Sequence, residues 1–318
     1  MSETLFTRRA AMAAPLAAGA ALAGLARPAG AAAPMLGASA GGFRRFRIGA
    51  MEVTTLHDGY ITLGGPYPIF GEDQFPEDVA ELAEANRLPT DRMAISFTVA
   101  LVNTGSALIL FDAGNGALRR PDAGKLLGAL AAAGHAPEQI DVVVITHMHP
   151  DHIGGLMEAG APAFPNARYV TGAREFDFFS QNAPENLSPL IESNVRPLAE
   201  KMTFVEAGGS VVSGVEAVEA FGHTPGHMAW HIESEGARLM ITADAANHFV
   251  ASLQRPDWHV RFDMDKEAAA ATRRALFGMI AADRIPFVGY HMPGAAVGYV
   301  EEMGEGFRYI PESYQLAL

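Results

Sequence analysis

The stretch THMHPDHIGG, residues 146–155, places three histidines and an aspartate within six consecutive positions. The chain has 318 residues and only 11 histidines, so an H-x-H-x-D-H string would arise by chance in roughly one such chain in a thousand. Three neighbouring imidazoles in a hydrophobic core would each need a buried hydrogen-bond partner. The string therefore predicts a metal site.

The spacing within this string predicts two metal positions rather than one. His147 and His149 are two residues apart, so in an extended chain their side chains leave on the same side and can reach one ion. Pro150 stiffens the next turn and redirects Asp151 and His152 toward a second position.

Further ligands are expected at the ends of other strands, because a catalytic metal ion needs three or more protein ligands and an open place for water. His223 follows the apolar stretch VEAVEAF, Asp244 ends RLMITAD, and His291 follows IPFVGY. A lone His or Asp at a strand end is more often a turn or capping residue, but three in corresponding positions favour a shared site. The chain has no cysteine, so His and carboxylate groups must hold any metal.

The four motifs HMHPDH, GHTPGH, ADA and GYH resemble, in this order, the metal motifs of the metallo-β-lactamase superfamily. The resemblance implies an α/β fold, a four-layered αβ/βα sandwich of two mixed sheets flanked by helices, with two divalent metal ions at one edge. Zn is the expected metal, and the same ligand types also suit Mn, Co or Fe. The resemblance assigns His147, His149 and His223 to one ion, Asp151, His152 and His291 to the other, and Asp244 to both.

Within the superfamily, the sequence is most similar to the branch of methyl parathion hydrolase, an organophosphate hydrolase. The similarity runs from FRIGAMEVTTLHDG through VNTGSALILFDAG and FGHTPGH to the tail GEGFRYIPESY, which lies outside the metal motifs. It also implies that Asp112, in FDAG, orients a ligand histidine.

The remaining chain reads as apolar strands alternating with helices. Helices are expected near 77–86, at about 122–133 and at about 265–282, and residues 64–93 form a Pro-rich excursion. A single catalytic domain of residues 34–318 is the simplest packing.

Residues 1–33 have the layout of an export signal. Arg8 and Arg9 precede a mildly apolar Ala/Gly/Leu stretch, and Ala-x-Ala sites end at Ala31 or Ala33. The paired arginines favour the twin-arginine route and a periplasmic location. A disordered Ala-rich tail or an uncleaved anchor is the alternative, and the body of the chain has no apolar run of the ~18 to 20 residues that a membrane span needs.

The net charge of −13 argues against a nucleic-acid partner, because an acidic surface repels phosphate backbones. A small-molecule substrate is expected instead. The sequence leaves the oligomeric state open, and a homodimer is compatible with it.

The expected chemistry is hydrolysis of a small neutral ester-like molecule, an aryl or alkyl ester, a lactone or a phosphotriester. Two divalent ions ~3.5 to 4 Å apart can share a water, lower its pKa and present hydroxide as the nucleophile. Asp151 or Asp244 would accept the proton. An acyl-homoserine lactonase is the first alternative and a mononuclear iron dioxygenase of the same fold the second; a periplasmic metal carrier is a further class.

Five residues are candidates for the substrate pocket: Leu118, Arg119, Phe179, Asn247 and His248. Polar groups at a pocket mouth lose water when an apolar leaving group docks, at ~1 to 3 kcal/mol for each one left unpaired. These residues therefore favour an ester or lactone over a large aryl phosphotriester. His227 and His231 are expected to be structural, because the metal sites are already supplied with ligands.

The export signal leads to the first prediction. Arg8→Lys combined with Arg9→Lys should retain the protein in the cytoplasm, because the twin-arginine pathway recognises that pair. Cell fractionation followed by immunoblotting measures the distribution. An unchanged periplasmic yield would show that another signal is used.

Overall fold

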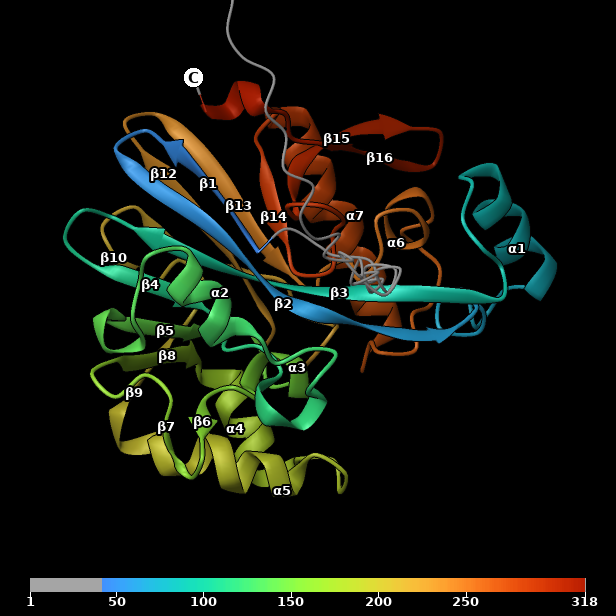
Figure 1. The fold of residues 1–318 in the computed structure, drawn as a ribbon. Coiled ribbons are helices and arrows are strands. Elements are labelled where there is room, and N and C mark those ends of the chain that lie inside the picture. Colours follow the sequence, from blue (N-terminus) through green and yellow to red (C-terminus); the bar gives the residue numbers. More distant parts are fainter. Residues whose placement is uncertain (1–41, 318) are drawn as a thin grey trace, which may run out of the picture. The chain divides into compact units, whose positions relative to one another are not determined.

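Two seven-stranded sheets lie at the centre of the fold in the computed structural model, which describes residues 42–317 (Figure 1). The expected signal at residues 1–33 lies outside the described residues. In spatial order, the first sheet contains β1 (Phe43–Ile48), β2 (Met51–Gly64), β3 (Arg92–Asn103), β4 (Leu108–Phe111), β5 (Val142–Ile145), β8 (Arg168–Gly172) and β9 (Met202–Val205). The second contains β10 (Ser210–Val212), β11 (Val215–Glu219), β12 (Met228–Ser234), β13 (Ala237–Ala243), β14 (Phe287–Gly289), β15 (Val297–Met303) and β16 (Gly306–Pro311).

Both sheets are mixed, as expected. Strands β4, β5, β8 and β9 are parallel to one another, and β13 is parallel to β14, whereas the other pairs in the two sheets are antiparallel. A short hairpin of β6 (Met157–Glu158) and β7 (Ala161–Pro162) stands apart from them.

Helices cover the outer face of each sheet. The α-helices are α1 (Pro76–Ala85), α2 (Leu126–Ala132), α3 (Pro150–Ile153), α4 (Ala173–Asn182), α5 (Ser188–Leu190), α6 (Ala251–Gln254) and α7 (Lys266–Asp283). A π-helical turn spans Ile191–Val195, and 3-10 turns span Gly116–Arg119, Pro137–Gln139, Arg196–Lys201 and Tyr314–Ala317. None of the helices in the described part of the chain is long and apolar enough to cross a membrane.

Three layers of apolar side chains hold this arrangement together. The layer between the sheets contains Val144 of β5 and Trp230 of β12, both fully buried. A second layer joins the first sheet to α2 and α4, and a third joins the second sheet to α7, where Phe277 packs against Phe287. The result is the four-layered αβ/βα sandwich that the resemblance implied.

The structure departs from the expected elements at several boundaries. Helix α2 begins at Leu126 rather than near 122, because Gly124 has a φ of 79°, outside the helical region. Residues 188–201 form short α, π and 3-10 turns rather than one continuous helix, because Pro189 and Pro197 interrupt them.

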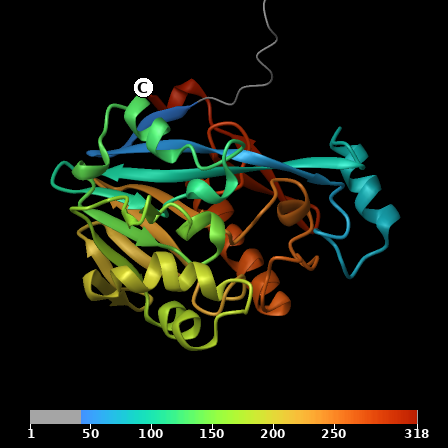
Figure 2. The same ribbon diagram turned by 60° about the horizontal axis from the view of Figure 1, so that its bottom comes forward.

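Strands β2 and β3 pair over their full length and extend together toward α1 (Figures 1 and 2). They form a long two-stranded ribbon with the Pro-rich excursion at its end. The helix expected near 77–86 is α1, which begins at Pro76. This ribbon forms one wall of the cavity described below.

Candidate metal centre

Seven His and Asp side chains meet where strands of both sheets end. Parallel neighbours present their carboxyl ends at one edge, so β4 and β5 deliver Asp112 and His147 together, and β13 and β14 deliver Asp244 and His291. Two groups result, and within each the candidate ligand atoms lie within 4.8 Å of one another. One group is His147, His149 and His223, and the other is Asp151, His152, Asp244 and His291.

Helix α3 explains how six residues reach two positions. His149 precedes the helix with extended backbone, φ −74° and ψ 157°, and Pro150 is its first residue. Asp151 and His152 then lie on the single helical turn, directed away from the path of the preceding strand. Pro150 thus begins the change of direction that the sequence predicted.

Asp244 lies between the two groups. Its Oδ2 is 2.9 Å from His291 Nε2 and 3.3 Å from His223 Nε2, and its Oδ1 is 3.1 Å from His152 Nε2. A carboxylate that faces ligands of both groups can bridge two ions.

Several polar atoms of the cluster are buried without a hydrogen-bond partner among residues 42–317. They are Nε2 of His147, Nε2 of His152 and Oδ1 of Asp244. Each such atom costs ~1 to 3 kcal/mol when it is left unsatisfied, and three in contact at one point need a common partner. Nitrogen and carboxylate donors of this kind suit divalent transition metals, so the residues present fit two metal ions.

Three ligand histidines are oriented through the ring nitrogen that faces away from the cluster. His152 Nδ1 lies 2.8 Å from Asp112 Oδ2, His223 Nδ1 lies 2.8 Å from Asp263 Oδ1, and His291 Nδ1 lies 2.8 Å from the carbonyl oxygen of Ser96. Because Nδ1 donates in each case, it is Nε2 of the neutral ring that presents a lone pair to the cluster.

Asp112 holds the end of β4 and the loop after β5 together. It accepts hydrogen bonds from the backbone N–H and the hydroxyl of Thr146, in addition to its contact with His152. Its φ of 71° lies in the left-handed region, which costs a non-glycine residue ~1 to 3 kcal/mol and is found mainly at functional sites. The role implied for Asp112 agrees with these contacts.

Glu175 and Asp263 support the site and were not predicted. Glu175, on α4, is fully buried and accepts hydrogen bonds from Met148 N, Thr224 Oγ1 and Gly226 N, so it ties the two histidine loops together. Burial raises the pKa of Glu175 to about 7 against the effect of these donors. Asp263 also forms a buried ion pair with Arg273. Only the tertiary packing distinguishes either residue from an ordinary surface carboxylate.

His227 and His231 are structural in this arrangement, as expected. Burial lowers the pKa of His227 to about 3, so the ring is neutral. Its Nδ1 donates to the carbonyl of Ala220 and its Nε2 accepts from the backbone N–H of Asp244, which fixes the bridging aspartate. His231 lies on β12 and accepts from Arg238.

A cavity of about 380 Å³ opens onto the cluster. Its floor contains Asp151 and Asp244, and the guanidinium of Arg119 lies 5.5 Å from the ring centre of Phe97 in its wall. The other walls are mainly apolar side chains of the β2–β3 ribbon and two loops: Ile61, Leu63, Ile95, Leu187 and Phe262, with Asn186 at the rim.

Arg119 is the one expected pocket residue that lines this cavity. Leu118, next to it on the 3-10 turn, points outward and is 65% exposed. Phe179 is wrong as a pocket residue, because α4 directs its ring into the core, where it is 1% exposed.

Asn247 and His248 were also expected at the pocket mouth, and neither lines this cavity. Asn247 is buried and donates to Asp244 Oδ2, so it supports the bridge. His248 lines a different cavity. The tight turn after β13 places these two residues on opposite sides, which their sequence spacing did not reveal.

A four-layered αβ/βα sandwich with two adjoining His and Asp groups at its strand ends is a fold built around a metal centre. The chain belongs to the metallo-beta-lactamase superfamily, whose sequence profile matches residues 96–286.

Comparison with known proteins places lactonases among the similar proteins. An N-acyl homoserine lactonase from Bacillus sp is 29% identical over 123 residues, 38% of this chain and 45% of the relative. A hydroxyacylglutathione hydrolase from Fuscovulum blasticum is 29% identical over 154 residues, 46% of this chain and 50% of the relative. The matched region spans about half the length of these curated relatives.

Solved structures match over more of the chain. AidC, a dizinc quorum-quenching lactonase in complex with the product N-hexanoyl-L-homoserine, is 28% identical with a TM-score of 0.80, and the match covers 86% of this chain and 98% of that one. The hydrolase AbOPH of the beta-lactamase superfamily is 25% identical with a TM-score of 0.80, covering 87% of this chain and 99% of that one.

The second prediction concerns the metal ligands. His149→Ala should lose most bound metal, because a group of three imidazoles that loses one keeps too few ligands. His231→Ala is the matched control, since His231 lies outside both groups. Elemental analysis of the purified variants measures metal per chain. Full metal content in His149→Ala would contradict the assignment.

The third prediction concerns the proton that His223 carries before a metal ion binds. In the metal-free protein burial lowers the pKa of His223, but hydrogen bonds to Asp244 and Asp263 outweigh burial and raise it to about 9. The ring is therefore protonated at neutral pH and must lose this proton to bind a metal ion. Metal binding should release the proton at about pH 7, and this contribution should disappear as the pH rises through about 9.

Calorimetric titration with Zn²⁺ in buffers of different ionisation enthalpy counts the released protons. Asp263→Asn removes one of the two stabilising carboxylates, so the variant should release fewer protons at neutral pH. If the wild type and Asp263→Asn release equal numbers of protons at about pH 7 and at about pH 9, His223 is neutral before the metal binds.

Proposed function

We propose that the protein is a hydrolase that uses two divalent ions, Zn²⁺ in the first instance, to cleave carboxylic esters or lactones that carry an apolar group. The observation that carries the proposal is the cavity of about 380 Å³ whose floor is the ligand cluster and whose walls are mainly apolar. Such a cavity suits a small molecule whose apolar part contacts the walls and whose reactive carbonyl lies at the floor.

Arg119 favours an ester or lactone over an aryl phosphotriester. It is the one arginine among the residues that line the cavity, and its guanidinium lies over the ring of Phe97. A guanidinium donates to a carbonyl or amide oxygen, whereas docking an apolar aryl group against it would remove its water without replacement. In a lactone with an acyl-amide side chain, the acyl chain can contact the apolar walls and the amide oxygen can accept a hydrogen bond from Arg119.

Bound metal ions would lower the pKa of a water molecule and polarise the carbonyl of the substrate. The chain's own residues then handle the proton. Asp151 lines the cavity, while Oδ2 of Asp244 is occupied by Asn247 and by the neighbouring imidazoles. This difference favours Asp151 as the acceptor of the proton, with Asp244 as the bridge.

The comparisons support the lactone branch of the proposal. The dizinc lactonase AidC is 28% identical over most of both chains, and N-acyl homoserine lactonases are among the curated relatives. A mononuclear iron enzyme would carry one Fe per chain, so elemental analysis separates it from the proposal. The export signal expected at residues 1–33 would place the activity in the periplasm.

The fourth prediction concerns the substrate. For the metal-loaded protein, kcat/KM for an acyl-homoserine lactone or an aryl ester should exceed that for methyl parathion by about tenfold or more, or about 1.4 kcal/mol in transition-state binding. Proton release measures lactone opening, and absorbance of the nitrophenol product measures the other two reactions. A phosphotriester rate equal to or above the lactone and ester rates would refute the preference.

Two variants test the role of Arg119 in this preference. Arg119→Met should lower kcat/KM for the lactone by about tenfold, because a charge-assisted hydrogen bond to the substrate is lost. The exposed Arg196, paired with Glu192 on the surface, gives the matched control Arg196→Met, which should retain the wild-type value.

A further inference from the structure

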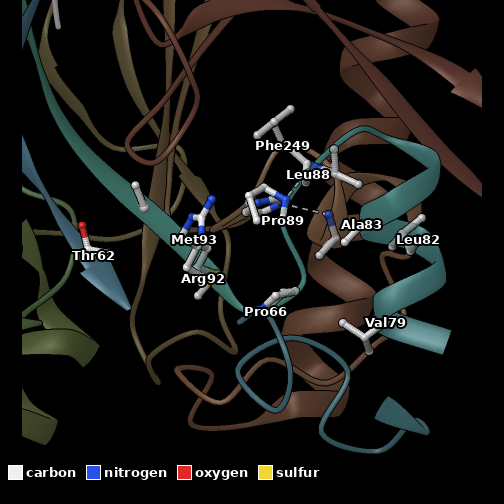
Figure 3. Close-up of a pocket in the computed structure, with 14 residues that line it drawn as sticks. Thr62, Pro66, Val79, Leu82, Ala83, Leu88, Pro89, Arg92, Met93 and Phe249 are labelled. Carbon is white, nitrogen blue, oxygen red and sulfur yellow. Dashed lines mark hydrogen bonds between the residues drawn. The ribbon is translucent and has the colours of Figure 1, made fainter. Parts of the chain in front are cut away.

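A second cavity, of about 330 Å³, lies between α1 and the β2–β3 ribbon (Figure 3). Figure 3 shows Val79, Leu82 and Ala83 of α1 on one side and Thr62 and Met93 of the ribbon on the other. Leu88, Pro89 and Phe249 contribute further apolar surface. Its volume is within the range of small-molecule sites.

This cavity is distinct from the one over the metal cluster, because no residue lines both. Successive side chains of a strand point to opposite faces. Ile61 pairs with Ile95, and both line the cavity over the cluster, whereas the next pair, Thr62 and Ala94, lines the second cavity.

His248 is the buried polar group of the second cavity, whereas Arg92, which also lines it, is 70% exposed with its Nη1 3.6 Å from Asp91 Oδ2. Nδ1 of His248 accepts hydrogen bonds from the backbone N–H groups of Val250 and Ala251, at 3.1 and 3.0 Å. Nδ1 is therefore the unprotonated nitrogen, and Nε2 carries the hydrogen. The ring packs between Phe70 and Phe249, with ring centres 5.2 and 4.9 Å away, which fixes its orientation.

Nε2 of His248 is a donor without an acceptor on the part of the chain that the structure describes. Burial lowers the pKa of the ring to about 4, so it is neutral at physiological pH. A neutral donor in a mainly apolar cavity favours a ligand with an uncharged oxygen acceptor, because a buried carboxylate would lose its water without gaining a buried opposite charge and an ammonium group offers only hydrogens.

We propose that this second cavity binds an alkyl chain that ends in a neutral carbonyl group, with the chain against α1 and the carbonyl oxygen accepting from His248 Nε2. The apolar walls would contact the alkyl chain. The hydrogen on Nε2, which the two bonds to Nδ1 fix there, would bond to the carbonyl oxygen. The inference does not depend on the reaction proposed for the metal cluster, because the two cavities have no lining residue in common.

Calorimetric titration of the metal-loaded protein with octanamide tests the proposal, which is the fifth prediction. Ala94→Phe places a ring in the second cavity and should raise the Kd of this site by about tenfold or more, because the ring occupies the ligand's volume. Leu63→Phe fills the other cavity instead and should leave this binding event unchanged. Octylamine, with the same chain and no acceptor in its protonated form, should bind about tenfold more weakly, or about 1.4 kcal/mol, because it leaves the His248 donor unpaired.

The proposal fails if Ala94→Phe binds octanamide as the wild type does, or if octylamine binds equally well. It also fails if Leu63→Phe abolishes all octanamide binding. A photoreactive octanamide carrying a terminal diazirine provides a test on the unmodified protein, independent of whether a variant folds. It should label residues 79–94 and 248–251, and labelling confined to the cavity over the cluster would overturn the inference.

Discussion

The structure depends on one electrostatic constraint: several ligand atoms that cannot satisfy each other are buried at a single point. Nε2 of His147 and His152 and Oδ1 of Asp244 have no hydrogen-bond partner among the described residues, although each is buried. Such a point is stable only when cations occupy it or when the surrounding fold is strong enough to hold it. The carboxylates of Asp112 and Asp263 meet part of this demand by fixing the imidazoles from behind.

The direction of the strands brings the remaining ligand atoms to this point and holds them there. Parallel pairs in each sheet bring two polar strand ends to one edge, and fully buried strands such as β5 make those ends rigid. Glu175 then joins the loop after β5 to the loop after β11 across the gap between the sheets. The positive φ of Asp112 and of Ala243 shows that the backbone is strained where it meets the cluster.

The β2–β3 ribbon extends this scaffold beyond the strand ends. One of its faces supplies the apolar wall of the cavity over the cluster, and the other supplies part of the cavity that contains His248. The alternation of side chains along two paired strands therefore separates two binding environments by the thickness of one sheet. The Pro-rich excursion that joins these strands contributes α1 to the second cavity alone.

The sequence by itself, through its motifs and the family that they resemble, determined the fold class and indicated the seven candidate ligands and the role of Asp112. Each candidate ligand either follows an apolar strand or lies in a six-residue motif with a proline at its turn. Parallel strands then bring the carboxyl ends that carry these ligands to one edge. The tertiary structure alone decided which residues line the cavities and which carboxylates support the site. Ile61, Ile95, Glu175 and Asp263 come from segments far from the motifs, and nothing in their neighbours distinguishes them. Phe179 and Leu118 were assigned wrongly because the direction of a side chain depends on how its helix or turn packs, which local spacing does not fix.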